Sequence, residues 1–168
     1  MDQRLTFIFR RRSIRHYRDK PVSKKDIIAL LEAGMAAPSA NDKKPWHFVV
    51  ITDRKKLDRL AKIHPYAEML TEATLCIAVC GDPKISSRYW VQDCSAATEN
   101  ILIATANIGL GAVWLGCHPR IERKKLLKDF LRIPEDIELL SLIAVGHPAE
   151  KKEIRTQYDV KKIHWENW

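Results

Sequence analysis

The sequence predicts a single α+β domain in which helices cover both faces of a central sheet. Two almost fully apolar runs, residues 75–80 (LCIAVC) and 139–146 (LLSLIAVG), are typical of strands buried on both faces. Segments with helical periodicity separate the apolar runs, which favours a sheet between two helical layers. A chain of 168 residues has the size of one domain, and no repeat or low-complexity linker divides residues 1–168.

The N-terminal part of the chain predicts two helices. Leu5, Ile8 and Phe9 mark one face of a short helix. Ser23 is placed to cap a second helix, and Pro38 follows the end of that helix. The inward side of the second helix is formed by Ile27, Leu30, Leu31 and Gly34.

The middle of the chain predicts a strand, a helix and a second strand. Residues 46–52 (WHFVVIT) form the first of these strands, and a helix begins near Asp53 with Leu57 and Leu60 on its apolar face. The second strand is the apolar run 75–80, which a Gly-Asp-Pro turn closes.

The longest predicted helix covers residues 89–107, and its alanines indicate close packing in the middle of the molecule. Gly109 follows this helix, where a left-handed residue commonly ends a helix. Residues 112–117 then predict a third strand, residues 124–132 a basic amphipathic helix, and residues 139–146 a fourth strand.

The C-terminal segment 147–168 combines many charges with large apolar side chains. Those side chains are Ile154, Tyr158, Val160, Ile163, Trp165 and Trp168. Exposing each of them to water costs on the order of 2 kcal/mol. We therefore expect this segment to dock on a second subunit.

The formal net charge is +8, and the sequence pI is about 9.4. Such a balance favours an anionic partner: a nucleic acid, a membrane surface or a phosphorylated cofactor. A nucleic-acid-binding module is one alternative, supported by the charge and by the tryptophans of the C-terminal segment. The dispersal of the lysines over several segments opposes it, because no recognition helix or stacking platform is evident.

The four cysteines favour a reducing compartment. On a strand, Cys76 and Cys80 would share a face about 13 Å apart, too far for one metal ion or one disulfide. We expect buried, reduced thiols in a cytoplasmic protein. The N-terminal residues lack a signal-peptide core, and no apolar stretch reaches membrane-spanning length, so we expect neither export nor membrane insertion.

A cationic run near the N-terminus, residues 11–15 (RRSIR), is the first candidate for a binding site. Its three guanidinium groups and one hydroxyl can gather around a phosphate, because the planar fork of arginine pairs with two phosphate oxygens at once. Taken alone, the same run also fits a solvated basic turn.

Other motifs indicate which kinds of ligand and reaction the chain can support. Gly109 and Gly111 follow a helix and open a strand, which is the reverse of a dinucleotide-binding loop. Gly116 ends that strand, where the lack of a side chain lets a ligand approach the backbone closely. The loop 38–42 (PSAND) offers a backbone ledge for a flat ring. The histidines lack metal-binding spacing, and no nucleophile elbow is present, so we expect neither a metal site nor a hydrolase.

In order along the chain stand RRSIRxY, PSAxxxxPW, the helical run VQDCSAATENILIATANIGLGAVWLG, LIAVGHP and a basic aromatic tail. Together these segments resemble the nitroreductase family of FMN-dependent oxidoreductases over residues 8–168. The resemblance implies a nitroreductase-like fold with a central, mostly antiparallel sheet flanked by helices. It also implies an intertwined homodimer that exchanges its C-terminal segments and holds FMN at the interface.

The resemblance also assigns roles to residues of this chain. Arg11, Arg12 and Ser13 match the positions that bind the flavin phosphate and ribityl chain, and Arg15 matches the cation beside the flavin pyrimidine. A fixed cation there would stabilise the negative charge of the reduced flavin. The remaining expected contacts are Pro38, Ser39 and Ala40 along the ring, Leu115 and Gly116 at N5 and O4, and Lys161 or Lys162 at the phosphate.

Two positions depart from the family pattern. Asp42 and Lys44 stand where many relatives have asparagine and glutamine against the flavin edge. An aspartate there can accept a hydrogen bond from flavin N3–H but opposes the reduced anion, and Lys44 would offset its charge.

The implied reaction is ping-pong. NAD(P)H passes a hydride to flavin N5 and leaves, and a small acceptor such as a nitroaromatic, a quinone or a flavin then takes two electrons in the same pocket. No catalytic acid or base is required, because the flavin carries the chemistry. Tyr66, Trp90 and the tail aromatics are candidate pocket walls. Within the same fold, a dehalogenase or a flavin-degrading enzyme is the alternative.

Overall fold

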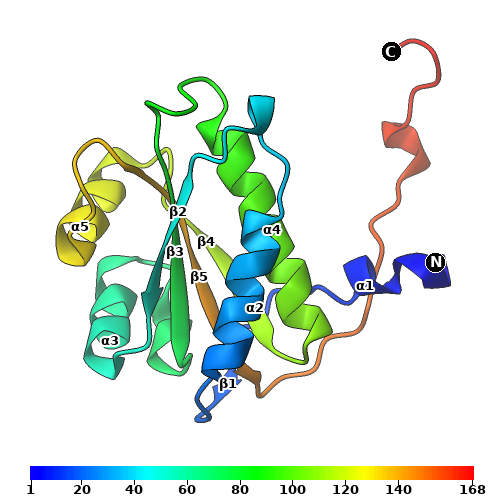
Figure 1. Ribbon diagram of the computed structural model, residues 1–168. Coiled ribbons are helices and arrows are strands. Elements are labelled where there is room, and N and C mark those ends of the chain that lie inside the picture. The colour runs from blue at the N-terminus through cyan, green and yellow to red at the C-terminus, as the bar shows by residue number, and fades with distance from the viewer.

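A five-stranded sheet in which every strand pairing is antiparallel forms the centre of the fold (Figure 1). The computed structural model describes residues 1–168. The strands are β1 (Tyr17–Arg18), β2 (Trp46–Ile51), β3 (Leu75–Gly81), β4 (Gly111–Gly116) and β5 (Glu138–Pro148). The long strand β5 is the hub, because it pairs with β1, β3 and β4, while β2 pairs with β3 at one edge. The predicted α+β class with an antiparallel sheet is confirmed.

Helices cover both faces of the sheet, also as predicted (Figure 1). One face carries α2 (Lys24–Met35) and α4 (Trp90–Asn107), and the other carries α3 (Arg54–Ile63) and α5 (Ile121–Leu131). The short helix α1 (Thr6–Phe9) precedes the sheet. Single turns of 3-10 helix complete the chain: η1 (Gln3–Leu5), η2 (Ala40–Asp42), η3 (Glu68–Thr71) and η4 (Val160–Lys162).

Strand β3 shows how the two cores are divided. Every residue of β3 is buried. Cys76 and Ala78 point into the core beneath α3 and α5, whereas Ile77 and Val79 point into the core beneath α2 and α4. This alternation explains why the strand reads as a continuous apolar run. All four cysteines are free and buried, and burial raises the pKa of the Cys80 thiol to about 12.

The predicted helix ends are confirmed at two places. The Ser23 hydroxyl accepts a hydrogen bond from the Asp26 amide at 3.1 Å and thereby caps α2. Gly109 has a φ of 80° directly after the end of α4, a left-handed conformation that glycine adopts without strain.

Three elements differ from the sequence prediction. Strand β1 was not predicted, because two residues carry no pattern, and its pairing extends β5 to Pro148. Helix α5 begins at Ile121, three residues before the predicted start, directly after Pro119 and Arg120. The predicted apolar face of the first helix is not buried within this chain, because α1 has only one turn and Leu5 and Ile8 are exposed.

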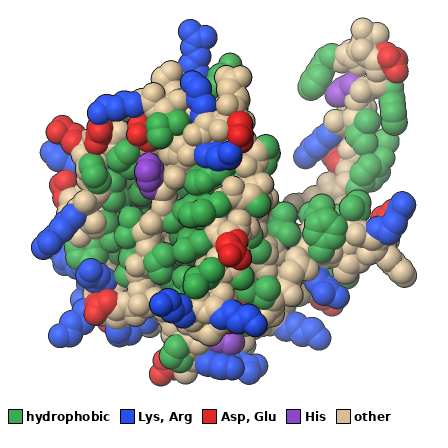
Figure 2. Space-filling view, viewed as in Figure 1, with side chains coloured by type: hydrophobic (Ala, Val, Ile, Leu, Met, Phe, Trp, Pro, Cys, Tyr) green, Lys and Arg blue, Asp and Glu red, His purple; other side chains and the backbone are tan.

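The C-terminal segment leaves the body of the protein after β5, and its green hydrophobic side chains stand off the surface (Figure 2). Trp165 is 82% exposed and Trp168 fully exposed, so neither contributes to the cores of its own chain. None of the helices has both the length and the hydropathy that crossing a membrane requires.

Gly111→Ala should destabilise the fold. A Cβ atom at position 111 would lie 2.8 Å from Cγ2 and 2.9 Å from Cβ of Ile14, and a β-branched side chain has little freedom to move away. We expect the free energy of unfolding to fall by about 1–3 kcal/mol in urea denaturation.

Gly116→Ala is the matched control for Gly111→Ala, because a Cβ at position 116 would meet nothing within 4 Å. Its free energy of unfolding should stay within about 0.5 kcal/mol of the wild-type value. Equal losses in the two variants would contradict the packing of Ile14 on Gly111.

Candidate functional site

The cationic run is held in an extended conformation beside β4. The Ile14 amide donates to the Ala112 carbonyl at 2.9 Å, and Ser13 forms a parallel bridge with Ala112. The Ile14 side chain is buried against Gly111, which explains the glycine at the start of β4. The run is therefore part of the folded body rather than the solvated turn that residues 11–15 alone also allowed.

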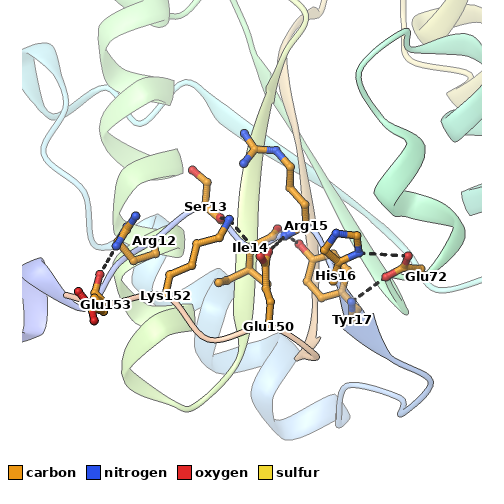
Figure 3. Close-up of polar contacts among 10 residues, drawn as sticks. All are labelled: Arg12, Ser13, Ile14, Arg15, His16, Tyr17, Glu72, Glu150, Lys152 and Glu153. Carbon is orange, nitrogen blue, oxygen red and sulfur yellow. Dashed lines mark hydrogen bonds and ion pairs between the residues drawn. The ribbon is translucent and has the colours of Figure 1, made fainter. Parts of the chain in front are cut away.

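The beginning of the C-terminal segment runs antiparallel along the other side of the cationic run (Figure 3). The contacts are Arg12 Nη1 to the Glu153 carbonyl, Lys152 Nζ to the Ser13 carbonyl at 2.7 Å, the Arg15 amide to Glu150 Oε1 at 2.6 Å, and the Ala149 amide to the His16 carbonyl at 2.8 Å. These pairs continue the register of β1 with β5, in which Tyr17 faces Pro148. The two ends of the sequence thus meet at the site.

Alternation along the extended run separates its side chains. Ile14 points into the core, whereas the Ser13 hydroxyl and the Arg15 guanidinium project to the opposite side (Figure 3). The Arg15 guanidinium forms no hydrogen bond or ion pair within the chain, although its backbone amide is bonded to Glu150. The amide of Arg15 holds the pKa of Glu150 below its usual range, so this carboxylate stays charged.

Arg11 and Arg12 line a cavity of about 210 Å³ together with Arg155 from the C-terminal segment. Arg11 also forms an ion pair with Glu99 of α4, with 3.2 Å between Nε and Oε1. Partial burial raises the pKa of Glu99, and the charge of Arg11 opposes that shift. Glu99 lines the same cavity, and three arginines against one carboxylate leave a net positive charge that can hold a dianion such as a phosphate monoester.

Sequence reasoning missed Arg155, because a lone arginine in a polar segment carries no pattern. Lys161 and Lys162, which were predicted to complete the phosphate site, lie in η4, and both are exposed. Neither of their ammonium groups forms a hydrogen bond or ion pair within the chain, so their role at the phosphate stays a prediction.

The predicted ledge 38–42 lies in a loop of residues 38–44, which we name the ledge loop, and this loop is anchored to the first turn of α4. The Ala40 amide donates to Asp93 Oδ1, and the Ser86 hydroxyl donates to Asp93 Oδ2, each at 2.9 Å. Asp93 is 4% exposed and was not predicted as a site residue. It holds Ala40 and, through its neighbour, Ser39 in place beside α4; Pro38 is exposed at the start of the loop.

The same loop contains three left-handed residues that are not glycine: Asn41, Asp42 and Lys44 have φ values of 53°, 55° and 50°. The Lys44 amide donates to the Ser39 hydroxyl at 2.9 Å, which holds the turn closed. Lys44 Nζ lies 2.8 Å from Asp42 Oδ2, so the two charges that depart from the family pattern offset each other. Such a concentration of strained backbone is typical of functional loops.

Gly116 ends β4 at the other end of the site. Leu115 is buried, whereas Gly116 is exposed, and its φ and packing require no glycine. Because Ala112 bonds to Ile14 on the side of β4 away from β5, strand alternation places the peptide groups of Gly116 on that same free side. Gly116 lies four residue steps beyond Ala112 along the strand, a distance of about 13 Å. The free edge of β4 therefore joins the cationic end to the glycine end.

Two histidines flank Gly116. His64 is 1% exposed; its Nε2 lies 3.0 Å from the Gly116 carbonyl, and its Nδ1 accepts from the Tyr66 amide at 3.2 Å. This pairing requires the neutral ring with the proton on Nε2. His118 packs edge-to-face on Trp90 at 5.0 Å, and its buried Nδ1 has no partner. No group of three or more His, Cys, Asp or Glu side chains is arranged to hold a metal ion.

Comparisons with known proteins agree with this architecture. The family model described as "Nitroreductase family" matches residues 8–64 and 64–147. A protein of Archaeoglobus fulgidus, provisionally named NADH dehydrogenase/NAD(P)H nitroreductase, is 45% identical over the full length of both chains. A crystal structure from Parabacteroides distasonis with the same provisional name has a TM-score of 0.96 at 45% identity, and each chain is covered completely.

A third relative is known in complex with a ligand. A provisionally named nitroreductase of Desulfovibrio desulfuricans was solved in complex with FMN; it is 32% identical, has a TM-score of 0.87 and matches 100% of this chain and 99% of its own. The matches span most or all of the chain. The protein therefore belongs to the nitroreductase family.

The stability of the protein should fall as the pH drops from 7 towards 5, in part because of His64. Burial is the largest cause that lowers the pKa of His64 below 6.5, the ordinary value. Between the two pKa values the unfolded chain binds a proton that the folded chain excludes, so acidification favours unfolding.

The measurement is urea denaturation of the wild type and of His64→Gln across this pH range. The variant lacks the titrating group, so its curve should be flatter, by at most about 1.4 kcal/mol per pH unit. Parallel curves would show that His64 takes up no extra proton on unfolding.

Proposed function

We propose that this chain is an FMN-dependent oxidoreductase that takes two electrons from NAD(P)H and passes them to a small acceptor in a ping-pong reaction. The observation that carries the proposal is the free edge of β4. It has a cationic, phosphate-sized cavity at one end and an open, side-chain-free glycine at the other. This layout suits an elongated molecule with a phosphate tail and a flat ring.

The residues present fit FMN at its phosphate end. Arg11, Arg12 and Arg155 would surround the phosphate, and the Ser13 hydroxyl points to the same side of the run as Arg15. The hydrogen bonds that hold residues 12–16 use backbone atoms of these residues, apart from the contacts of Arg12 with Glu153 and of the His16 ring with Glu72, so the Ser13 hydroxyl and the Arg15 guanidinium remain available to a ligand.

The ring end is equally well matched. Gly116 offers its backbone where a Cβ would intrude on a ring, and no other feature of the chain requires glycine there. Arg15, whose guanidinium has no partner within the chain, would place a positive charge beside the ring. The ledge loop from Pro38 to Ala40 would supply a flat backbone surface, and the Asp42–Lys44 pair would bring little net charge to the ring edge.

When bound, FMN supplies the two-electron chemistry. The chain binds and orients the ring, excludes water from one side of it and places Arg15 where negative charge develops. The site offers no acid–base pair of its own, so protons for the acceptor would come from water. Nicotinamide and acceptor would use the same open side in turn, as a ping-pong order requires.

The proposed assembly is a homodimer. Apolar side chains of α1 and of the C-terminal segment are exposed in the single chain, among them Phe7, Tyr158 and Trp165. Burying a large side chain of this kind stabilises an assembly by about 2 kcal/mol. A second copy that receives the segment after Glu153 would cover these groups and bring the tail aromatics to the partner's site.

The function is tested by adding FMN to the purified protein and separating free from bound flavin. We expect yellow protein with FMN stoichiometric to the chain, bleaching by NAD(P)H without oxygen, and recovery of colour when a nitroaromatic or quinone is added. Initial rates against both substrates should give parallel double-reciprocal lines. Protein that stays colourless at micromolar FMN would disprove the proposal.

Arg15→Ala should slow reduction of the bound flavin by tenfold or more, roughly, because a fixed charge at the ring is lost. The free energy of unfolding should change by less than about 0.5 kcal/mol, since the guanidinium has no partner in the chain. Stopped-flow reduction and urea denaturation measure the two effects.

Arg18→Ala is the matched control, because it removes an equally exposed arginine from β1 outside the site. If the two variants reduce flavin at equal rates, Arg15 does not act on the ring.

A further inference from the structure

The Gly116 carbonyl is bound by two donors that come from different elements. His64, the C-cap residue that follows α3, approaches it with Nε2 at 3.0 Å, and Arg123 of α5 donates from Nη1 at 2.9 Å. Two side-chain donors thus serve one exposed carbonyl at the end of a strand, where water could serve instead. The chain therefore controls the orientation of this residue closely.

The His64 ring has no freedom to turn. Its Nδ1 accepts from the Tyr66 amide, so the ring is bonded on both nitrogens and surrounded by protein. The cap of α3 does not need this side chain, because the His64 backbone amide already bonds to the Leu60 carbonyl. The ring N–H serves Gly116 alone.

Arg123 is held from a second direction. Its guanidinium carbon lies 5.3 Å from the centre of the Tyr66 ring, which favours a cation–π contact. Tyr66 thus contacts both donors, the histidine through its amide and the arginine through its ring. The three side chains form one unit around the Gly116 carbonyl, which we name the Gly116 clamp: His64, Tyr66 and Arg123.

The peptide that follows Gly116 is fixed from the other side. The amides of Cys117 and His118 both donate to the Leu140 carbonyl, each at 3.0 Å. Leu140 is the residue that β5 skips in its register with β3, where Val79 faces Ser141 and Cys80 faces Leu139. Such a bulge commonly redirects the backbone next to an active site.

Holding the carbonyl also sets the amide of the same residue. In an extended strand the N–H and C=O groups of one residue point to the same side of the strand. On β4 that side is the free edge, and Gly116 carries no side chain that would restrict its own rotation. A glycine at a strand end turns easily, so the clamp adds to the strand pairing in keeping its N–H oriented.

We propose that His64 and Arg123 are positioning residues that hold the Gly116 N–H in line with the reacting edge of the bound flavin. This inference rests on the proposed function and extends it to residues that do not themselves touch the ring. Arg123 would have a second effect, because its guanidinium brings a positive charge to Gly116 at the end of β4.

The experiment compares His64→Leu, His64→Gln and Arg123→Met with the wild-type FMN-bound protein. Leucine removes the donor, glutamine keeps an N–H group near the Nε2 position, and Lys125→Met removes one exposed charge from the same helix as a control. The readouts are the midpoint potential of the bound FMN, hydrogen exchange of the Gly116 amide by NMR, the rate of flavin reduction, the affinity for FMN and the thermal midpoint.

We expect His64→Leu and Arg123→Met to slow flavin reduction by about tenfold, with a lower midpoint potential and faster exchange at Gly116. The affinity for FMN should fall by only about threefold, because the arginines at the phosphate are untouched. His64→Gln should show a rate of flavin reduction and an exchange rate of the Gly116 amide close to those of the wild type. Lys125→Met should match the wild type in every readout.

A loss of thermal stability with unchanged potential, reduction rate and Gly116 exchange would overturn the proposal, because the clamp would then be a packing feature only. If His64→Leu does not fold, Arg123→Met decides, since that side chain is only half-buried. Wild-type protein that binds no FMN would overturn the proposed function itself. If the wild type binds and reduces FMN, and the His64 and Arg123 variants reduce it at the same rate as the wild type, this inference alone is overturned.

Discussion

The pairing of residues 12–16 with residues 149–153 is the constraint on which the site depends. It continues the β1–β5 register beyond Tyr17 and Pro148, and it fixes the cationic run as an extended strand. Three arginines in five residues repel one another, and free of this pairing they would be solvated as a mobile turn. Held extended, they alternate, so that Ile14 enters the core while Arg15 faces outwards.

Strand β4 sets the distance between the two ends of the candidate site. Its first residues receive the cationic run, and its last residue, Gly116, ends at the clamp of His64 and Arg123. Strand β4 pairs with β5 on one side only, and on its other edge the chain bonds only the two ends, through Ile14 at Ala112 and through His64 and Arg123 at Gly116. A rigid strand with one free edge can present donors at a fixed spacing, as a cofactor with a phosphate tail and a flat ring requires.

The sequence predicted those parts of the fold that local patterns encode. The structure confirmed the apolar run of β3, the cap at Ser23 and the left-handed Gly109. Burial on both faces and helix ends each require particular residue types at adjacent positions, so a local pattern predicts them. Strand β1 has no such mark, since its existence depends on a partner more than a hundred residues away. The exposed face of α1 was also unpredictable from periodicity, which shows that a face is apolar but not what covers it.

The candidate site divides in the same way. Residues whose chemistry is visible by type and order, such as Arg11, Arg15 and Gly116, were proposed from the sequence through its resemblance to a family. Asp93, Arg155 and His64 were not, because an isolated polar residue acquires a role only from its neighbours in space: Ala40 meets Asp93 across 53 residues, and His64 meets Gly116 across 52. The sequence by itself determined most of the elements, the family and the arginines of the cationic run. The tertiary structure alone decided which of those groups share one strand edge, because hydrophobic periodicity is a local property whereas strand pairing joins distant segments.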